Sequence, residues 1–195
     1  MQTDPSLQTS MNYHRAILSL WAIWLVYWIV SSFGNKRAVY RTNPLWRFAA
    51  LLIVVGLVAW WRSHPEFFGQ RLFPRTEAAA LAGTVLCAIG IGFSIWARAV
   101  LGRNWSGGPV IKEGHELVQT GPYRLVRHPI YTGILLAVLG SALAGGRVGD
   151  LMLFLTVIIM LTLKLRIEES LMQRQFGERY AEYRKRTKAL IPSVF

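Results

Sequence analysis

The chain has 195 residues, of which 53% are hydrophobic and only 16% are charged. A soluble domain of this length does not need so apolar a composition, which is typical instead of an integral membrane protein. The formal net charge of +12 does not indicate a nucleic-acid partner, because basic residues beside apolar spans set membrane topology and contact anionic lipid.

The first fifteen residues are polar and lack the basic start and the small-residue cleavage site of a secretory signal, so we expect a short N-terminal tail over residues 1–15. Five apolar segments follow, each near the ~20 residues with which a helix crosses hydrocarbon. They cover residues 16–33, 45–61, 78–101, 130–145 and 148–165. The sequence therefore predicts an all-α, multi-pass integral membrane protein with about five transmembrane helices.

The fourth apolar segment is the shortest, and it is rich in glycine, alanine and serine. Only residues 145–149 separate it from the fifth segment. Small residues let helix backbones approach closely in a membrane, so we expect these two segments to form a tight helical hairpin.

Most of the 22 basic residues fall on one side of the membrane if all five segments span it. The positive-inside rule then places the N-terminus outside and the C-terminus in the cytoplasm. The second loop is the exception, because its Arg62, Arg71 and Arg75 lie on the opposite side. If residues 45–61 were re-entrant rather than spanning, the N-terminus would lie inside, while the third loop and the C-terminal tail would stay cytoplasmic.

Beyond the last span, an interrupted apolar stripe continues to Gly177, which predicts a break before a second short helical stretch. We expect this C-terminal segment to be amphipathic and to lie against the cytoplasmic face. Tyr180 and Tyr183 are three residues apart on one helical face, where we expect them to act as interfacial anchors.

Polar and aromatic residues gather directly before the fourth span. The stretch 114–133 reads GHELVQTGPYRLVRHPIYTG, with two His, two Arg, two Tyr and one Glu at the membrane boundary. In an otherwise apolar protein, such a segment indicates a small-molecule site. We expect no metal there, because no metal-ligand spacing appears, and the single cysteine, Cys87, excludes a cysteine cluster and an intrachain disulfide.

Motifs from residue 115 to residue 192 follow one another in a fixed order. They are H-E-L-V at 115–118, G-P-Y-R at 121–124, R-H-P-I-Y-T-G at 127–133, E-E at 168–169, F-G at 176–177, tyrosine at 180 and 183, and I-P at 191–192. This series resembles the isoprenylcysteine carboxyl methyltransferase family and is more loosely similar to phospholipid N-methyltransferases and the C-terminal part of sterol reductases. The resemblance makes residues 78–195 the expected catalytic core, whereas residues 16–77, with two helices and their loops, carry no motif.

The resemblance implies that S-adenosylmethionine binds at the cytoplasmic membrane face. This cofactor presents an adenine ring, ribose hydroxyls, an ammonium, a carboxylate and a sulfonium, so its site needs an apolar or aromatic slot, a carboxylate and a cationic or N–H donor. Tyrosines suit the slot, Glu168 the carboxylate, and His128 or the N-terminus of the fourth helix the donor. The cofactor-binding residues that the resemblance implies are His115, Glu116, Leu117, Val118, Tyr123, His128, Pro129, Ile130, Tyr131 and Glu168.

Two points about these residues stay open. His115 binds either through its side chain or through the backbone of its segment. Glu168 and Glu169 point about 100° apart on a helix, so at most one should face the pocket, and the spacing favours Glu168. The alternative for both is an ordinary surface charge that pairs with a neighbour such as Arg166.

The methyl acceptor is less well defined than the cofactor. The family places an Arg four residues before the cofactor Glu, but this chain has Lys164 there and Arg166 two residues later. Arg grips a carboxylate with two parallel hydrogen bonds, whereas Lys acts as a point charge. An ionised carboxylate acceptor needs no general base, so Lys164 and Arg166 would only position it. A thiol or amine would need a base, and the sequence identifies none.

The sequence thus predicts a membrane-embedded S-adenosylmethionine-dependent methyltransferase whose lipophilic acceptor, an isoprenylcysteine-like carboxylate being one candidate, reaches the site from the bilayer. One alternative is an NADPH-dependent reductase of the sterol-reductase type, although those enzymes have more than five spans. The other alternative is a non-catalytic membrane protein of the same fold.

Overall fold

The computed structural model describes residues 5–33, 38–41, 52, 55–56, 59–74, 76–105, 110–112 and 117–192. Its longer helices are α1 (Pro5–Ser32), α4 (Glu77–Leu101), α5 (Pro129–Gly145) and α6 (Val148–Phe176), and a shorter helix, α7 (Glu178–Arg186), follows. The smaller elements are strand β1 (Ala38–Arg41), helix α3 (Pro65–Phe68), the 3-10 turns η1 (Gly102–Asn104) and η2 (Gly121–Arg124), and strand β2 (Val110–Lys112).

Three of these helices are long and apolar enough to cross a membrane, namely Met11–Ser32 within α1, α4 and α6, and α5 is a shorter apolar helix. They match four of the five predicted spans and confirm an all-α membrane fold. The remaining predicted span, residues 45–61, lies largely outside the described residues. Helix α1 begins at Pro5 and so takes in most of the segment 1–15 that we expected to be a tail.

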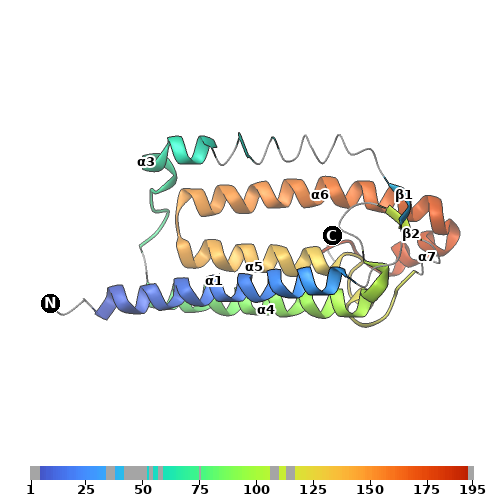
Figure 1. Ribbon diagram of the computed structural model, residues 1–195, viewed down its shortest axis with the longest axis horizontal. Helices are drawn as coiled ribbons and strands as arrows, with labels where there is room; N and C mark the ends of the chain where they lie inside the picture. Colours follow the sequence, from blue (N-terminus) through green and yellow to red (C-terminus); the bar gives the residue numbers. More distant parts are fainter. Residues whose placement is uncertain are drawn as a thin grey trace.

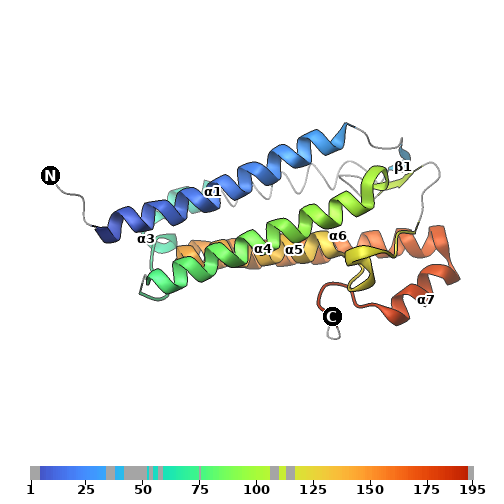
Figure 2. The same ribbon diagram turned by 90° about the horizontal axis from the view of Figure 1, so that it is seen from below.

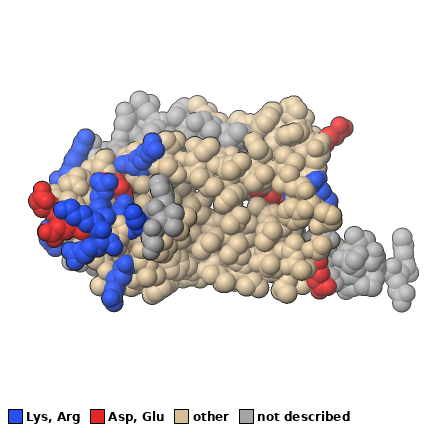
Figure 3. All heavy atoms as spheres, turned by 180° about the vertical axis from the view of Figure 1, so that it is seen from behind, with Lys and Arg blue, Asp and Glu red and all other residues tan. Residues whose placement is uncertain are grey.

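The four longer helices run side by side along the long axis of the molecule (Figures 1 and 2). One end of this bundle carries the turn between α5 and α6, and the other end carries α7 and the two strands. Figure 3 shows Lys and Arg side chains gathered at the α7 end. The exposed basic residues of this part of the chain include Arg179, Arg184, Lys185, Arg186 and Lys188.

Glycines allow α4 and α5 to approach backbone to backbone. A Cβ atom on Gly90 would meet the carbonyl oxygen of Gly133, and one on Gly140 would meet that of Gly83, each at 2.5 Å. The hairpin predicted between the fourth and fifth apolar segments is present, and Gly146 turns the chain with a φ of 65°. However, the small residues of α5 pack on α4, and not on α6 as we expected, since α4 presents the matching glycines.

The predicted break after the last span is confirmed at Gly177, which has a φ of 52° and separates α6 from α7. The expected role of Tyr180 and Tyr183 as interfacial anchors is wrong, because the two side chains are only 2% and 4% exposed. The turn at Gly177 brings α7 back against η2, and the Tyr183 hydroxyl donates to the carbonyl oxygen of Tyr123 at 2.6 Å.

Strands β1 and β2 form a two-stranded antiparallel sheet, with Tyr40 opposite Ile111 and Arg41 opposite Val110. The sequence pattern did not predict this pair, because runs of three or four residues are too short to show the two-residue periodicity of a strand. The sheet ties the segment after α1 to the segment after α4, close to the start of the motif-rich stretch.

Candidate active site

The chain near the C-terminus fixes the N-terminus of α5. His128 is the N-cap residue of α5, and Pro129 occupies the first helical position, where its missing N–H has no intrahelical partner to lose. The Arg127 N–H donates to the Lys188 carbonyl at 2.9 Å, and the His128 N–H donates to the Ala189 carbonyl at 3.0 Å. Segments sixty residues apart in the sequence therefore form one wall of the site.

His128, Tyr131 and Glu168 form the polar centre of this region. The rings of His128 and Tyr131, three residues apart on one face of α5, stack with centroids 5.4 Å apart and an angle of 5°. The Tyr131 hydroxyl donates to Glu168 Oε2 at 2.6 Å, and His128 Nδ1 lies 3.8 Å from the same oxygen. Helix α6 thus presents the Glu168 carboxylate to the first turn of α5, and Tyr131 fixes its orientation.

Glu169 lies against the other nitrogen of the same imidazole. Its Oε1 is 2.7 Å from both Nε and Nη2 of Arg127 and 3.4 Å from His128 Nε2, and its Oε2 is 3.7 Å from Arg184 Nε. Arg127 also donates through Nη1 to the Thr187 carbonyl. The sequence led us to expect only one carboxylate at the pocket, but both reach His128, because its two ring nitrogens lie on different edges.

The two carboxylates differ in their electrostatic surroundings. Glu169 is 14% exposed and is neutralised by the guanidinium of Arg127, whose side chain is 9% exposed. Glu168 is 20% exposed, and among the described residues its lysine partner is Lys164, with Nζ 3.9 Å from Glu168 Oε1. Since a carboxylate can accept about four hydrogen bonds, Glu168 keeps acceptor capacity that Glu169 has largely used.

Lys164 and Arg166, the two residues expected to position an acceptor, lie on different faces of α6. Lys164 is half-buried beside the polar centre, and its Nζ is 5.3 Å from the centroid of the Tyr131 ring. Arg166 is exposed. Two residues along a helix turn a side chain by about 200°, so the structure does not bring Arg166 to Glu168 or Lys164.

Aromatic and aliphatic side chains surround the polar centre. Tyr123 and Ile130 are each 7% exposed, and burial together with the nearby Tyr183 and Glu168 raises the pKa of Tyr123 well above its ordinary value. Val118 packs against this cluster, and Leu117 beside it is half-buried. The buried members are Ala97, Tyr123, Ile130, Tyr131, Leu165, Ala189 and Leu190.

Among the cofactor-binding residues that the sequence predicts, His115 and Glu116 lie outside the described residues. Sequence reasoning assigned no role to Arg127 and ranked Glu169 second to Glu168, yet both hold the imidazole of His128 between α6 and the C-terminal segment. Arg127 is the first residue of the R-H-P-I-Y-T-G motif, and this position was the only feature of the sequence that could have indicated its role. Its partner lies 42 residues away, a separation that no local pattern reveals.

The polar centre offers the groups that S-adenosylmethionine requires. The imidazole of His128 is held between two carboxylates, with Nδ1 3.8 Å from Glu168 Oε2 and the buried Nε2 3.4 Å from Glu169 Oε1. The Glu168 carboxylate suits an ammonium or a ribose hydroxyl, and the cluster around Tyr123 suits an adenine ring. The residues present therefore fit this cofactor chemically.

A sequence profile decides the family. The profile of the phospholipid methyltransferase family matches residues 78–179, just over half of the chain. The chain belongs to this family. The match begins with α4 and ends in α7, so it contains the described polar centre and all of the helices that form it.

Individual proteins are also similar to this chain in sequence. The cobalt-zinc-cadmium resistance protein CzcN of Cupriavidus metallidurans is 28% identical over 152 residues, which make up 77% of this chain and 63% of that protein. The protein-S-isoprenylcysteine O-methyltransferase of Schizosaccharomyces pombe is 35% identical over 81 residues, 41% of this chain and 34% of the relative. This phospholipid methyltransferase family member thus spans less than two thirds of the length of these relatives.

A solved structure has a similar fold. The eukaryotic intramembrane Ras methyltransferase ICMT superposes with a TM-score of 0.62 and 20% sequence identity. The superposition covers 100% of this chain and 70% of that protein. At this level of identity the likeness shows a shared fold, including the membrane bundle.

Proposed function

We propose that this member of the phospholipid methyltransferase family is an S-adenosylmethionine-dependent methyltransferase that acts on a lipophilic acceptor in the membrane. One observation carries the proposal: the Tyr131 hydroxyl orients the Glu168 carboxylate at 2.6 Å, beside His128 Nδ1 at the start of α5. This pair of features lies inside the region that matches the family.

The roles of the residues follow from their surroundings. Glu168 accepts hydrogen bonds from the cofactor's ammonium or ribose, because Glu169 is already neutralised by Arg127. His128 presents Nδ1 beside Glu168, and Tyr123, Ile130 and Val118 enclose the adenine. S-adenosylmethionine, when bound, supplies the activated methyl group.

Methyl transfer depends on alignment of the acceptor and on exclusion of water, since the leaving thioether is neutral and needs no acid. Alignment of this kind contributes up to about 7 to 11 kcal/mol to a reaction barrier. The aliphatic and aromatic cluster around Tyr131 excludes water from the polar centre. The chain's own contribution is therefore mainly to bind and to orient the two reactants.

We place the acceptor on the face of α6 that carries Lys164. Helical spacing places Val157 and Met160, both half-buried, on the face that carries Lys164, so a lipophilic group can lie along them from the bilayer. The Lys164 ammonium would attract an acceptor carboxylate such as that of an isoprenylcysteine, the substrate class in the name of the Schizosaccharomyces pombe relative. Exposed Arg166 would contribute only from the membrane surface.

We also propose that the site faces the cytoplasm. The exposed basic residues of α7 and of the following segment lie at the end of the bundle where α5 begins (Figures 1 and 3). Basic residues next to membrane spans are enriched on the cytoplasmic side. By this rule the α5–α6 turn faces the opposite side.

Equilibrium binding of labelled S-adenosylmethionine to the purified full chain in detergent tests the proposal. We expect saturable binding that S-adenosylhomocysteine displaces and NADPH does not. Glu168→Ala should weaken it at least tenfold, whereas Glu178→Ala, which removes an exposed carboxylate of α7, should leave it unchanged. Displacement by NADPH alone, or no binding by a folded sample, would support the reductase or the non-catalytic alternative instead.

A further inference from the structure

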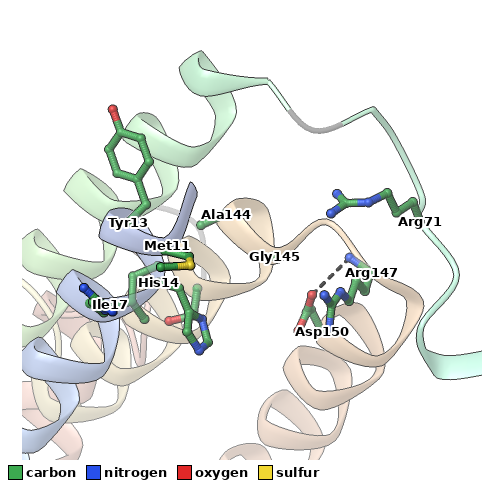
Figure 4. A pocket seen from close by; sticks show the side chains of 11 residues that line it. Met11, Tyr13, His14, Ile17, Arg71, Ala144, Gly145, Arg147 and Asp150 are labelled. Carbon is green, nitrogen blue, oxygen red and sulfur yellow. Dashed lines mark hydrogen bonds between the residues drawn. The ribbon is translucent and has the colours of Figure 1, made fainter. Parts of the chain in front are cut away.

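A cavity lies at the end of the bundle opposite the candidate active site. It has a volume of about 490 Å³ and separates α1 from the α5–α6 turn. Figure 4 shows side chains from both sides around it. Its lining includes His14 and Ile17 of α1, Ala144 of α5, Arg147 and Asp150 at the start of α6, and Arg71 from the segment after α3.

The backbone holds two of these arginines side by side. Arg71 and Arg147 face each other in an antiparallel β-bridge. Two hydrogen bonds of 2.9 Å, one on each side of the bridge, fix residues 70–72 against the turn 146–148. Residues directly opposite in an antiparallel bridge project to the same side, and Figure 4 shows both guanidinium groups beside the cavity.

The cavity carries an excess of positive charge. Arg15 and His14 of α1 line it together with the two bridged arginines, and Asp150 is the carboxylate among the lining residues. Asp150 is engaged locally, because its Oδ2 accepts the Arg147 backbone N–H at 3.0 Å and so caps α6. Neither bridged guanidinium forms an ion pair with a carboxylate of the described residues.

The positive charge of Arg71 and Arg147 is not explained by the rule that concentrates basic residues on the cytoplasmic side. The turn between two apolar helices of a membrane bundle lies at a bilayer surface, at the level of the lipid headgroups. With the orientation proposed above, Arg71 and Arg147 lie on the side of the membrane that the positive-inside rule leaves poor in basic residues. The cavity also has apolar lining residues, among them Met11, Ile17 and Ala144, which no free anion requires.

We propose that the cavity is a phospholipid site, in which Arg71 and Arg147 bind the phosphate of the headgroup. Two guanidinium groups fixed in register match the several acceptor oxygens of a phosphate. Arg15 and His14 approach the same headgroup from α1, and Ile17 and Ala144 contact the glycerol and the upper part of an acyl chain. This site is independent of the proposed methyltransferase activity.

Native mass spectrometry of the full chain, released from detergent after incubation with one lipid at a time, tests the site. The probes are phosphatidylglycerol, a diacylglycerol with the same acyl chains but no phosphate, and inorganic phosphate. The variants are Arg71→Gln with Arg147→Gln and, as a matched control, Arg62→Gln. Arg62 is an exposed arginine of the helical residues 59–63 just before α3, and it does not line the cavity.

We expect one phosphatidylglycerol to stay bound to the wild-type chain and to the Arg62→Gln variant. The double variant should bind it about thirtyfold more weakly, since each arginine near a lipid phosphate contributes roughly a fivefold step in affinity. The diacylglycerol should not be retained. Equal retention of phosphatidylglycerol by the double variant, or equal retention of the diacylglycerol, would overturn the proposal. Inorganic phosphate that binds as tightly as the lipid would overturn the lipid assignment.

Discussion

Replacing Arg127 with methionine should detach the C-terminal segment from the start of α5. Arg127 Nε and Nη2 both lie 2.7 Å from Glu169 Oε1, and Nη1 donates to the Thr187 carbonyl. Methionine keeps much of the apolar length of the side chain but none of its donors. The variant therefore leaves a carboxylate and a carbonyl oxygen without their main partner in a largely buried place.

The size of the effect follows from burial. Removal of one partner from a buried ion pair costs about 3 to 5 kcal/mol, because the remaining charge stays desolvated. Glu169 is 14% exposed and keeps Arg184 at 3.7 Å, so the lower end of this range, about 3 kcal/mol, is the better value. In a chain of this size, about 3 kcal/mol lowers the Tm by about 6 to 12 °C.

Thermal unfolding of the purified protein in mild detergent measures this shift. Limited trypsin digestion adds a local readout, because a detached α7 unfolds and its backbone then becomes cleavable after Arg184 and the neighbouring basic residues. Arg184→Met is the matched control: its guanidinium is 50% exposed, so its removal should cost less than about 1 kcal/mol. Combining Arg127→Met with Glu169→Gln removes the stranded charge and should recover part of the lost Tm. An Arg127→Met protein with the wild-type Tm would refute the reasoning.

Three further predictions concern single contacts. Gly90→Ala should lower the free energy of unfolding in detergent by about 1 to 3 kcal/mol, because the added Cβ collides with the α5 backbone. Gly92→Ala is the control and should leave this free energy unchanged, because its added Cβ meets nothing within 4 Å. Tyr131→Phe removes the hydroxyl donor to Glu168 and should weaken S-adenosylmethionine binding about tenfold in the binding assay. Loss of this hydrogen bond to a charged group, about 1.5 kcal/mol, should also lower the Tm by about 3 to 6 °C. Burial raises the pKa of Tyr183 to about 12, so the neutral phenol stabilises the fold below pH 10, and this stabilisation is lost as the pH rises toward 12. The Tyr183→Phe variant cannot ionise at this position, so its Tm should fall less than the wild-type Tm over this pH range. A Tm profile of Tyr183→Phe parallel to the wild type between pH 9 and pH 11.5 would contradict the assignment.

Local and compositional features of the sequence determined the class of the protein. Apolar segments long enough to cross hydrocarbon predicted α1, α4, α5 and α6 without any knowledge of their neighbours. The R-H-P-I-Y-T-G motif predicted the start of α5, since Pro129 can occupy only the first turn of a helix without loss of a hydrogen bond. Gly177 predicted the break before α7, because a positive φ favours glycine.

The tertiary structure decided which of these elements meet. Small residues indicate that a helix can be approached closely, but they do not identify the partner, so the glycines of α5 were assigned to α6 and pack on α4. Tyr180 and Tyr183 looked like surface residues because an amphipathic pattern gives one apolar face without saying whether lipid or protein covers it. Only the turn at Gly177 and the contact with η2 settle that choice.

At the candidate site, too, the sequence determined the chemistry of single residues, and the tertiary structure decided which residues meet. The chemistry of His128, Tyr131 and Glu168 could be proposed from their motifs, because each residue type implies its own donors and acceptors. The hold of Arg127 on Glu169, and the bridge between Arg71 and Arg147, join segments 42 and 76 residues apart. The sequence alone does not give the distance between such residues. These distances decide that Glu169 is neutralised while Glu168 stays available, and that Arg71 and Arg147 lie side by side.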